Sequence, residues 1–198
     1  ERVKLNPASL RAKRLLAWER SLFKRASRVL ADTPVHADYF TRVLGVPEKN
    51  LAVVYVGAES ARFKPEPLAS RAEGGPLEVF FYRSFIPLQA PQIVVNAASL
   101  YQGPPVKWVL LGQGPLRKSC EERARGLENV SFEDWLPYEK LPERILQADI
   151  LLGVFGTTPK AGRVIPNKVF QSMACGGPVV TRSANAYPEA LSTAVDSG

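Results

Sequence analysis

The chain alternates short apolar runs with amphipathic stretches along most of its length. The first strong pattern is helical and covers residues 8–27, where apolar side chains recur every three or four positions between Lys and Arg residues. This spacing predicts an amphipathic basic helix. Its apolar face is expected at Leu15, Trp18, Leu22 and Ala26.

The segment after this helix is predicted to form a strand, a helix and a second strand. Thr33 is a suitable N-cap, Pro34 fits the first helical turn, and Gly45 is a typical stop for a helix ending near Leu44. The apolar, β-branched composition of residues 28–31 and 51–56 favours strands on either side of it.

Residues 57–76 contain three Pro and three Gly without any apolar period, which is typical of a linker. We therefore expect a first domain over residues 1–60, a linker over 61–76 and a second domain over 77–198. Because the chain starts at Glu1 without an initiator Met, we expect it to be a fragment of a longer two-domain protein, with the second domain truncated at its C-terminus.

Strands and helices alternate regularly in the second domain. The predicted strands are 77–82, 106–111, 130–132, 150–155 and 178–181, and the predicted helices are 90–101, 116–127, 139–148 and 167–175. Apolar strands alternating with helices specify a parallel sheet covered on both faces. The predicted fold class is therefore α/β, a doubly wound Rossmann-like sheet, with ligands at the carboxyl ends of its strands.

Composition narrows the class of protein. The chain is 45% hydrophobic and 23% charged, as in globular domains, and no apolar run approaches the roughly 20 residues of a membrane-spanning helix. Cys120 and Cys175 fall in two separate predicted helices, which favours reduced thiols in a cytoplasmic protein. With a single His they cannot build a zinc site, so no metal is expected.

The net charge of +7 arises in the first 30 residues, which hold nine Lys and Arg against two Glu. A local basic segment suits an anionic lipid surface or a polyanion, and a solvated helix face is an equally good interpretation. No aromatic stacking platform accompanies the charge, so nucleic acid is not an expected partner.

The candidate chemistry lies after the predicted strands. Gly112, Gln113 and Gly114 form a G-x-G turn, which either admits a ligand to the backbone or only satisfies a turn that needs positive φ. Residues 153–168 form a long loop that ends at a helix N-terminus, a favourable place for phosphate. Thr157, Thr158, Arg163 and Lys168 could contact such a phosphate, although the alternative is that Asn167 caps the helix and the cations are solvated. His36 is expected to have a packing or surface role.

Five motifs in order resemble a known family. The run from Gly162 to Val180, GRVIPNKVFQSMACGGPVV, looks like the nucleotide-sugar-binding signature of GT-B glycosyltransferases, in the retaining group called group 1 or family four. Matching motifs stand at residues 110–114, 130–135, 141–149 and 174–180, and residues 32–36, 53–57 and 63–65 resemble the end of the family's N-terminal, acceptor-side domain and its connection.

The resemblance implies a transferase that takes a sugar from a UDP- or GDP-sugar donor, with retention and without cofactor or metal. The acceptor could be a glycan, a lipid-linked sugar or a small molecule, and residues 8–27 would then meet an anionic membrane surface from the cytoplasmic side. This fragment alone would bind donor but not transfer sugar. The diphosphate and sugar would lie against Phe155, Gly156, Thr157, Thr158, Arg163, Val164, Ile165, Pro166, Asn167 and Lys168, the ribose against Gln171, and the nucleotide against Ser84, Gly112, Gln113, Gly114, Trp135 and Leu136.

The chain departs from the family pattern at several of these positions. Arg163 and Gln171 stand where the family commonly has two Glu, and Arg83-Ser84 and Gln89-Ala90 replace its Gly-Arg and Lys-Gly pairs. Arg163 and Lys168 are the candidates to replace the lost cations, and Gln171 can still bond a ribose hydroxyl. No catalytic residue is identified. The alternatives are a non-catalytic nucleotide-sugar-binding module and, less well supported, a sugar-nucleotide epimerase.

Overall fold

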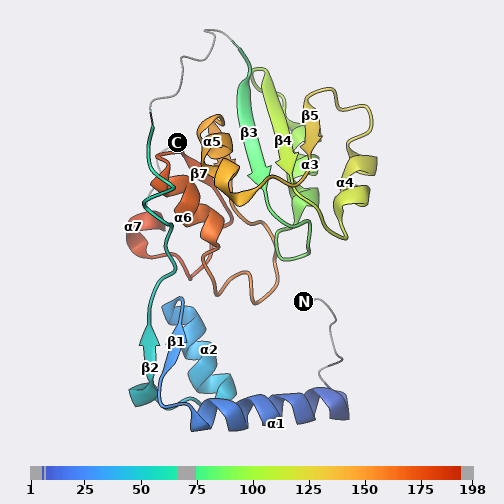
Figure 1. Cartoon of the computed structure of the whole chain (residues 1–198). Helices are drawn as coiled ribbons and strands as arrows, with labels where there is room; N and C mark the ends of the chain where they lie inside the picture. Colours follow the sequence, from blue (N-terminus) through green and yellow to red (C-terminus); the bar gives the residue numbers. More distant parts are fainter. Residues whose placement is uncertain (1–5, 7, 67–74, 193–198) are drawn as a thin grey trace. The chain divides into compact units, whose positions relative to one another are not determined.

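The computed structural model of the chain describes Asn6, residues 8–66 and residues 75–192 (Figure 1). The described residues divide into two compact units. The first contains the residues up to Val56 with 159–165 and those from Ser183 onward, and the second contains Gly57–Thr158 and Pro166–Arg182. The division falls at Val56 and not at residue 60, and the sequence pattern did not indicate that two later segments join the first unit.

The first unit has the predicted order of helix, strand, helix and strand. Its elements are α1 (Leu10–Arg25), β1 (Val29–Ala31), α2 (Pro34–Leu44), the short 3-10 helix η1 (Glu48–Asn50), β2 (Leu51–Val53) and α7 (Glu189–Ser192), which was not predicted. Thr33 caps α2 by accepting the N–H of His36 at 3.1 Å, and Gly45 ends it with a φ of +71°. The strand predicted over 51–56 ends at Val53 because β1 offers only three residues for pairing.

The predicted apolar face of α1 is confirmed only at Ala26 and is wrong at its other three residues. Leu16 and Phe23 pack, with Ala26, against the small core around Val29, and the Phe23 ring lies 5.3 Å from that of Phe40. Leu15, Trp18 and Leu22 are instead exposed. The helix therefore carries two apolar stripes, and within the described residues only one of them is covered.

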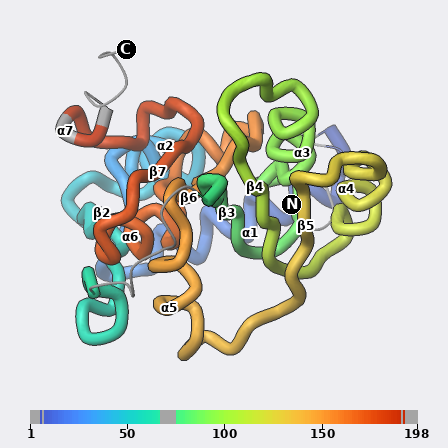
Figure 2. Tube along the Cα trace, turned by 90° about the horizontal axis from the view of Figure 1, so that it is seen from above, coloured from blue at the N-terminus to red at the C-terminus, as the bar shows by residue number. Residues whose placement is uncertain are grey.

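The second unit is built on one parallel sheet (Figures 1 and 2). Its strands are β3 (Leu77–Tyr82), β4 (Val106–Leu111), β5 (Val130–Glu133), β6 (Ile150–Leu152) and β7 (Val179–Val180), in the spatial order β5-β4-β3-β6-β7. Its helices are α3 (Pro91–Leu100), α4 (Arg117–Arg123), η2 (Tyr138–Lys140), α5 (Leu141–Leu146) and α6 (Asn167–Ala174). The predicted doubly wound parallel sheet is confirmed.

Strand order reverses at β3. The chain runs from β3 outward to β4 and β5, and then returns to place β6 on the other side of β3. The carboxyl end of β3 is therefore the switch point at which ligands bind in such sheets. The strand predicted over 150–155 ends at Leu152. Beyond it the Val154 N–H donates to the Thr181 hydroxyl at 3.1 Å.

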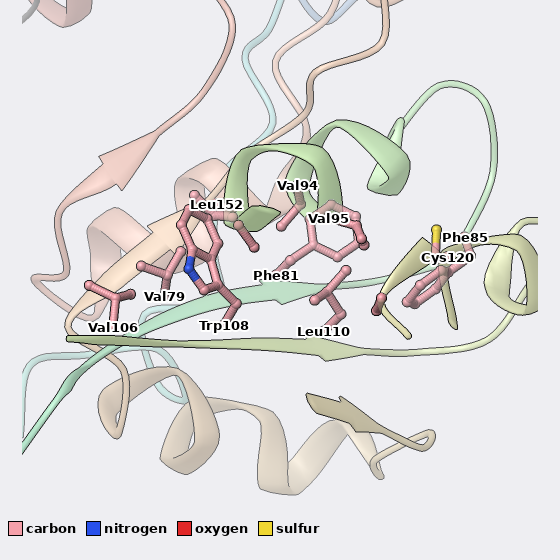
Figure 3. Close-up of a cluster of buried hydrophobic side chains, with 12 residues drawn as sticks. Val79, Phe81, Phe85, Val94, Val95, Val106, Trp108, Leu110, Cys120 and Leu152 are labelled. Carbon is pink, nitrogen blue, oxygen red and sulfur yellow. The ribbon is translucent and has the colours of Figure 1, made fainter. Parts of the chain in front are cut away.

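Alternate residues of β3 supply the cores on the two faces of the sheet. Phe81 lies with α3 and α4 in one cluster, which Figure 3 shows. Phe80 lies in the other cluster, between the sheet and α5, together with Phe63. Phe63 is only 1% exposed, so the part of the expected linker around it is packed into the second unit. Residues 67–74 of that linker lie outside the described residues.

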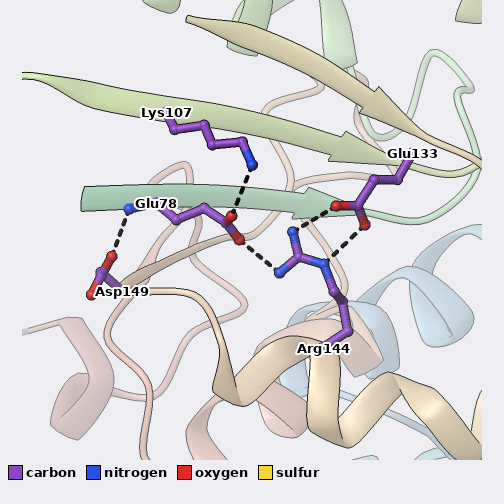
Figure 4. Close-up of polar contacts among 5 residues, drawn as sticks. All are labelled: Glu78, Lys107, Glu133, Arg144 and Asp149. Atoms are coloured by element: carbon purple, nitrogen blue, oxygen red, sulfur yellow. Dashed lines mark hydrogen bonds and ion pairs between the residues drawn. The ribbon is translucent and has the colours of Figure 1, made fainter. Parts of the chain in front are cut away.

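A charged cluster fixes α5 to the sheet (Figure 4). The Arg144 guanidinium donates two hydrogen bonds of 2.9 Å to Glu133 and one of 2.6 Å to Glu78, and it lies 4.1 Å from the centre of the Phe80 ring. Burial alone would lower the pKa of Arg144, but these hydrogen bonds outweigh it and raise the pKa. Lys107 contacts Glu78 at 3.8 Å, and Asp149 accepts the Glu78 N–H at 2.6 Å.

Cys120 and Cys175 are unpaired and buried on opposite faces of the sheet. Burial raises the pKa of Cys120 to about 11, which keeps its thiol protonated at neutral pH. None of the helices in the described part of the chain combines the length and apolar character needed to cross a membrane.

Candidate functional site

A cavity of about 330 Å³ opens at the carboxyl ends of β3 and β4, beside the point where strand order reverses. Its volume falls within the range of about 300–1,000 Å³ that is usual for small-molecule sites. The lining residues come from the ends of β3 and β4, the segment after β5, and helices η2, α5 and α6. They are Tyr82, Arg83, Ser84, Leu111, Gly112, Gln113, Trp135, Leu136, Tyr138, Leu141 and Gln171.

The cavity brings together most of the residues that the sequence assigned to the nucleotide and its ribose. These are Ser84, Gly112, Gln113, Trp135, Leu136 and Gln171. The other lining residues were missed, although Tyr82 and Leu111 are the last residues of predicted strands. The strand ends of a parallel sheet meet at its carboxyl edge. The same rule, applied to Tyr82 and Leu111 as it was to their neighbours, would have predicted both.

The turn after β4 needs both of its glycines for conformational reasons. Gly112 has a φ of +132° and Gly114 a φ of +151°. A Cβ on Gly112 would overlap the carbonyl oxygen of Arg83, and one on Gly114 would lie 2.7 Å from that of Phe85. Gly112 also lines the cavity, whereas Gly114 does not. The structural interpretation of the G-x-G turn therefore holds for both glycines, and the ligand interpretation stays a prediction for Gly112.

The turn after β3 keeps a glycine-like backbone without glycine. Arg83 has a φ of +133° and Ala90 a φ of +49°, and they are the only non-glycine residues with positive φ in the described part of the chain. Both stand at positions where the family pattern has Gly.

Gln171 presents an unused hydrogen-bond acceptor at the cavity wall. It lies on α6, is 5% exposed, and its Oε1 has no hydrogen-bond partner. A buried acceptor without a partner costs about 1–3 kcal/mol, which a ligand hydroxyl could recover. This arrangement suits the ribose contact expected of Gln171.

Other lining residues combine an aromatic surface with fixed polar groups. Trp135 is 70% exposed, so its indole is available to stack on a planar ligand. Gln113 donates to Asp134 at 2.7 Å, and the Tyr138 hydroxyl donates to Glu59 at 3.0 Å. The pKa of Tyr138 is raised, first by burial and then by the Glu59 carboxylate, so Tyr138 stays neutral and keeps its proton.

Lys168 does not line the cavity. Its side chain is fully buried, its Nζ lies 3.9 Å from the centre of the Phe81 ring, and no hydrogen-bond partner reaches it. Burial, and secondarily the charge of Arg83, lower the pKa of Lys168 well below its ordinary value. The sequence could not show this burial, because a Lys in the first turn of a helix is usually solvated.

Arg163 belongs to the first unit. Its guanidinium lies 3.9 Å from the centre of the Tyr39 ring, and its carbonyl oxygen accepts a hydrogen bond from the Thr33 hydroxyl. The two cations expected at the diphosphate are therefore engaged with aromatic rings, each inside its own unit. Their assigned role stays a prediction.

The remaining residues of the predicted diphosphate loop are divided between the units. Phe155, Gly156, Thr157, Thr158, Pro166 and Asn167 belong to the second unit, and Val164 and Ile165 to the first. Pro166 is the N-cap of α6, which begins without any side-chain cap, so Asn167 does not cap this helix. The alternative interpretation of Asn167 as a cap is wrong.

The other candidates have structural roles in the described residues. His36 bonds Asp32 at 2.6 Å and packs 4.4 Å from the Phe40 ring, in agreement with the expected packing role. Across the described ranges, no cluster of three or more His, Cys, Asp or Glu could hold a metal ion.

Comparison with known proteins identifies the family of this chain. A family model described as glycosyl transferases group 1 matches residues 76–197. Two curated relatives match most of the chain. WcaL of Escherichia coli (strain K12), a glycosyltransferase assigned to colanic acid biosynthesis, is 27% identical over 179 residues, and D-inositol 3-phosphate glycosyltransferase of Segniliparus rotundus is 25% identical over 194. These alignments cover 85% and 91% of this chain but 42% of each relative.

Solved structures share the fold. The Anabaena protein Alr3699/HepE in complex with UDP-glucose matches with a TM-score of 0.71 and 20% identity, over 88% of this chain and 50% of that one. WaaG, a glycosyltransferase involved in lipopolysaccharide biosynthesis, matches with a TM-score of 0.72 and 18% identity, over 95% of this chain and 53% of that one. The parallel α/β architecture is that of the GT-B fold.

Proposed function

The chain belongs to the glycosyl transferases group 1 family, and from this premise we propose that its cavity binds a nucleoside diphosphate sugar, with UDP- and GDP-sugars as the candidate donors. The observation that carries the proposal is the position of the cavity. It opens at the switch point of the parallel sheet, and its walls gather six residues that the family resemblance had assigned to the nucleotide and its ribose.

The cavity walls match the parts of such a ligand. Trp135 offers an aromatic face for the base, Gln171 offers an unpaired acceptor for a ribose hydroxyl, and Gly112 is part of the lining. The N-terminus of α6 has no side-chain cap, and a helix N-terminus favours a phosphate. Solved relatives in complex with UDP and UDP-glucose agree with this kind of donor.

In the whole protein we propose transfer of the sugar to an acceptor hydroxyl with retention. The bond between the anomeric carbon and the diphosphate oxygen breaks, and its electron pair leaves with the nucleoside diphosphate. The acceptor oxygen bonds the same face of that carbon while its proton passes to the departing phosphate. Fixed cations and amide groups would stabilise the charge that develops there, with no metal required. Because the chain spans 42% of the length of its curated relatives, we expect it to bind donor without transferring sugar.

A non-catalytic nucleotide-sugar-binding module is the second candidate, and one observation favours it. None of the residues that line the cavity in the described part of the chain is an Asp or Glu, and Gln171 stands where the family commonly has Glu. An epimerase, which needs acid and base groups at the sugar, has no support from this lining. Sugar transfer by the full-length protein would exclude the module.

The outer stripe of α1 supports a second contact, with an anionic membrane surface. Leu15, Trp18 and Leu22 are exposed along one side of the helix, and α1 carries six Lys and Arg residues and one Glu. An exposed apolar stripe with cationic flanks is typical of helices that lie in the lipid interface. We propose that this face brings the enzyme to membranes that hold lipid-linked acceptors.

Vesicle sedimentation tests the membrane contact. Vesicles of phosphatidylcholine with phosphatidylglycerol should retain the chain, vesicles of phosphatidylcholine alone should not, and Trp18→Ser should release it. Leu30→Ser is the matched control, because Leu30 is also exposed but lies on β1. Equal retention of the Trp18 and Leu30 variants would show that the α1 stripe is not the contact.

Isothermal titration with UDP, GDP and their sugar conjugates tests donor binding. One nucleotide series should bind, and Trp135→Ala should weaken it about tenfold, a loss of about 1.4 kcal/mol. Trp18→Ala is the control, because Trp18 is an exposed tryptophan of the first unit. The proposal fails if neither nucleotide binds, or if the two tryptophan variants weaken binding equally.

A further inference from the structure

Arg83 has a backbone conformation that its residue type disfavours. Its φ of +133° lies in the region that is normally left to glycine, where a Cβ crowds the backbone. The conformation is held from both sides of the turn, because the Arg83 N–H donates to the Leu111 carbonyl at 3.0 Å and Gly112 packs against the Arg83 carbonyl. A glycine at residue 83 would adopt this backbone without strain.

The side chain of Arg83 is free to meet a ligand. It is exposed, it lines the cavity, and it forms no ion pair with any residue that the structure describes. Arg83 is also the one charged residue among the described residues of the cavity wall. An uncompensated guanidinium at the mouth of a small-molecule cavity is a site for an anionic group.

The electrostatics of the neighbouring groups lead to the same ligand class. Lys168 is buried behind the same strand end without a partner, and the charge of Arg83 contributes to the lowering of its pKa. The cavity wall offers no carboxylate to either basic group. A ligand that brings negative charge would relieve this imbalance.

We propose that Arg83 binds the phosphates of the nucleotide and is the residue that makes the cavity prefer a nucleoside diphosphate to a nucleoside. This inference rests on the proposed function. It assigns the phosphate contact to Arg83. The residues expected there from the sequence were Lys168, which is buried, and Arg163, which belongs to the other unit. The planar guanidinium of arginine can donate two parallel hydrogen bonds to a phosphate. This contact gives a functional reason for a strained arginine at a position where glycine would fit.

The experiment compares four versions of the chain against nucleosides and nucleoside diphosphates. Wild type, Arg83→Gly, Arg83→Gln and Arg83→Lys are each titrated with uridine, UDP, guanosine and GDP. Arg83→Gln keeps the strained backbone and the length of the side chain but loses the charge, and Arg83→Lys keeps the charge. Arg123→Gln, on α4 and outside the cavity, is the control for loss of one arginine.

Arg83→Gly and Arg83→Gln should weaken the diphosphate by about tenfold, or 1.4 kcal/mol, and leave the nucleoside unchanged. Arg83→Lys should retain part of the preference, and Arg123→Gln all of it. Arg83→Gly alone should also raise the thermal midpoint, because it removes the backbone strain.

Two results would overturn the inference while leaving the proposed function intact. One is a diphosphate affinity of Arg83→Gln equal to that of wild type. The other is an equal loss for nucleoside and diphosphate, which would mean that Arg83 shapes the cavity without touching phosphate. Failure of the wild-type chain to bind any of the four compounds would instead refute the proposed function, and this inference with it.

Discussion

Replacement of Gly112 by Ala should damage both the fold and the site. Gly112 has a φ of +132°, and a Cβ there would overlap the backbone carbonyl of Arg83. Backbone atoms cannot rotate away as a side chain can, so the ends of β3 and β4 would have to separate. The hydrogen bond of 3.0 Å from the Arg83 N–H to the Leu111 carbonyl lies where they would part.

The expected cost can be worked out from these contributions. The positive φ costs about 1–3 kcal/mol for a residue with a Cβ, and loss of the strand-end hydrogen bond adds about 1 kcal/mol. With the steric overlap, Gly112→Ala should lower the free energy of unfolding by about 3 kcal/mol or more. Gly126→Ala is the matched control, because Gly126 also has a positive φ, +85°, but its Cβ would meet nothing within 4 Å. It should cost only the positive-φ contribution of about 1–3 kcal/mol, and so at least about 1 kcal/mol less than Gly112→Ala.

Urea unfolding followed by tryptophan fluorescence measures both variants. Both substitutions are made in a Trp18→Phe background, so that the signal comes from Trp108 and Trp135, which belong to the unit that carries the substitutions. Gly112→Ala should also lose nucleotide binding, whereas Gly126→Ala should keep it. If the two variants lose the same stability, the close approach of Gly112 and Arg83 is not what the turn requires, and the reasoning is refuted.

Two further substitutions test the interior of the second unit. Arg144→Met keeps an aliphatic chain over the Phe80 ring but removes the charge shared by Glu78 and Glu133, and should cost about 2–4 kcal/mol in urea unfolding; a loss below about 1 kcal/mol would show that the cluster contributes little. Lys168→Met should stabilise the free chain at neutral pH, because burial first, and then the charge of Arg83, lowers the pKa of Lys168 well below 10.5 in the folded state. The unfolded chain then holds a proton that the folded chain releases, so the stability of wild type should rise with pH from the lowered pKa up to 10.5, by up to about 1.4 kcal/mol per pH unit. Unfolding measured in steps from neutral pH toward 10.5 should show a flatter profile for Lys168→Met, and identical profiles would contradict the burial of an unpaired amine.

The architecture of the second unit could be predicted from local patterns. Its strands are apolar runs, its helices are amphipathic, and a regular alternation of the two permits few topologies. The pattern also located Ser84 and the Gly112–Gly114 turn, because the carboxyl ends of parallel strands meet at one edge, whereas Trp135, Leu136 and Gln171 came only from the family resemblance. Thr33, Pro34 and Gly45 likewise located α2, because caps and stops act within one helical turn.

The features that were missed depend on packing between distant segments. Leu16 and Leu15 are adjacent in α1, and only the core around Val29 decides which of them is covered. Phe63 stands in a Pro- and Gly-rich stretch whose composition gives no sign that its ring enters the core. The burial of Lys168 and the positive φ of Arg83 both oppose the preference of the residue type. Such exceptions are expected where function has shaped the chain more strongly than stability.

The central claim is that a nucleotide binds at the carboxyl edge of the parallel sheet in the second unit. The most direct measurement is an NMR titration of the isotope-labelled chain with UDP and with GDP. One of them should shift the backbone amides of Gly112 and Gln113, the indole N–H of Trp135 and the side-chain amide of Gln171, while the indole N–H of Trp18 stays in place. Shifts confined to other residues, or no shift with either nucleotide, would contradict the account.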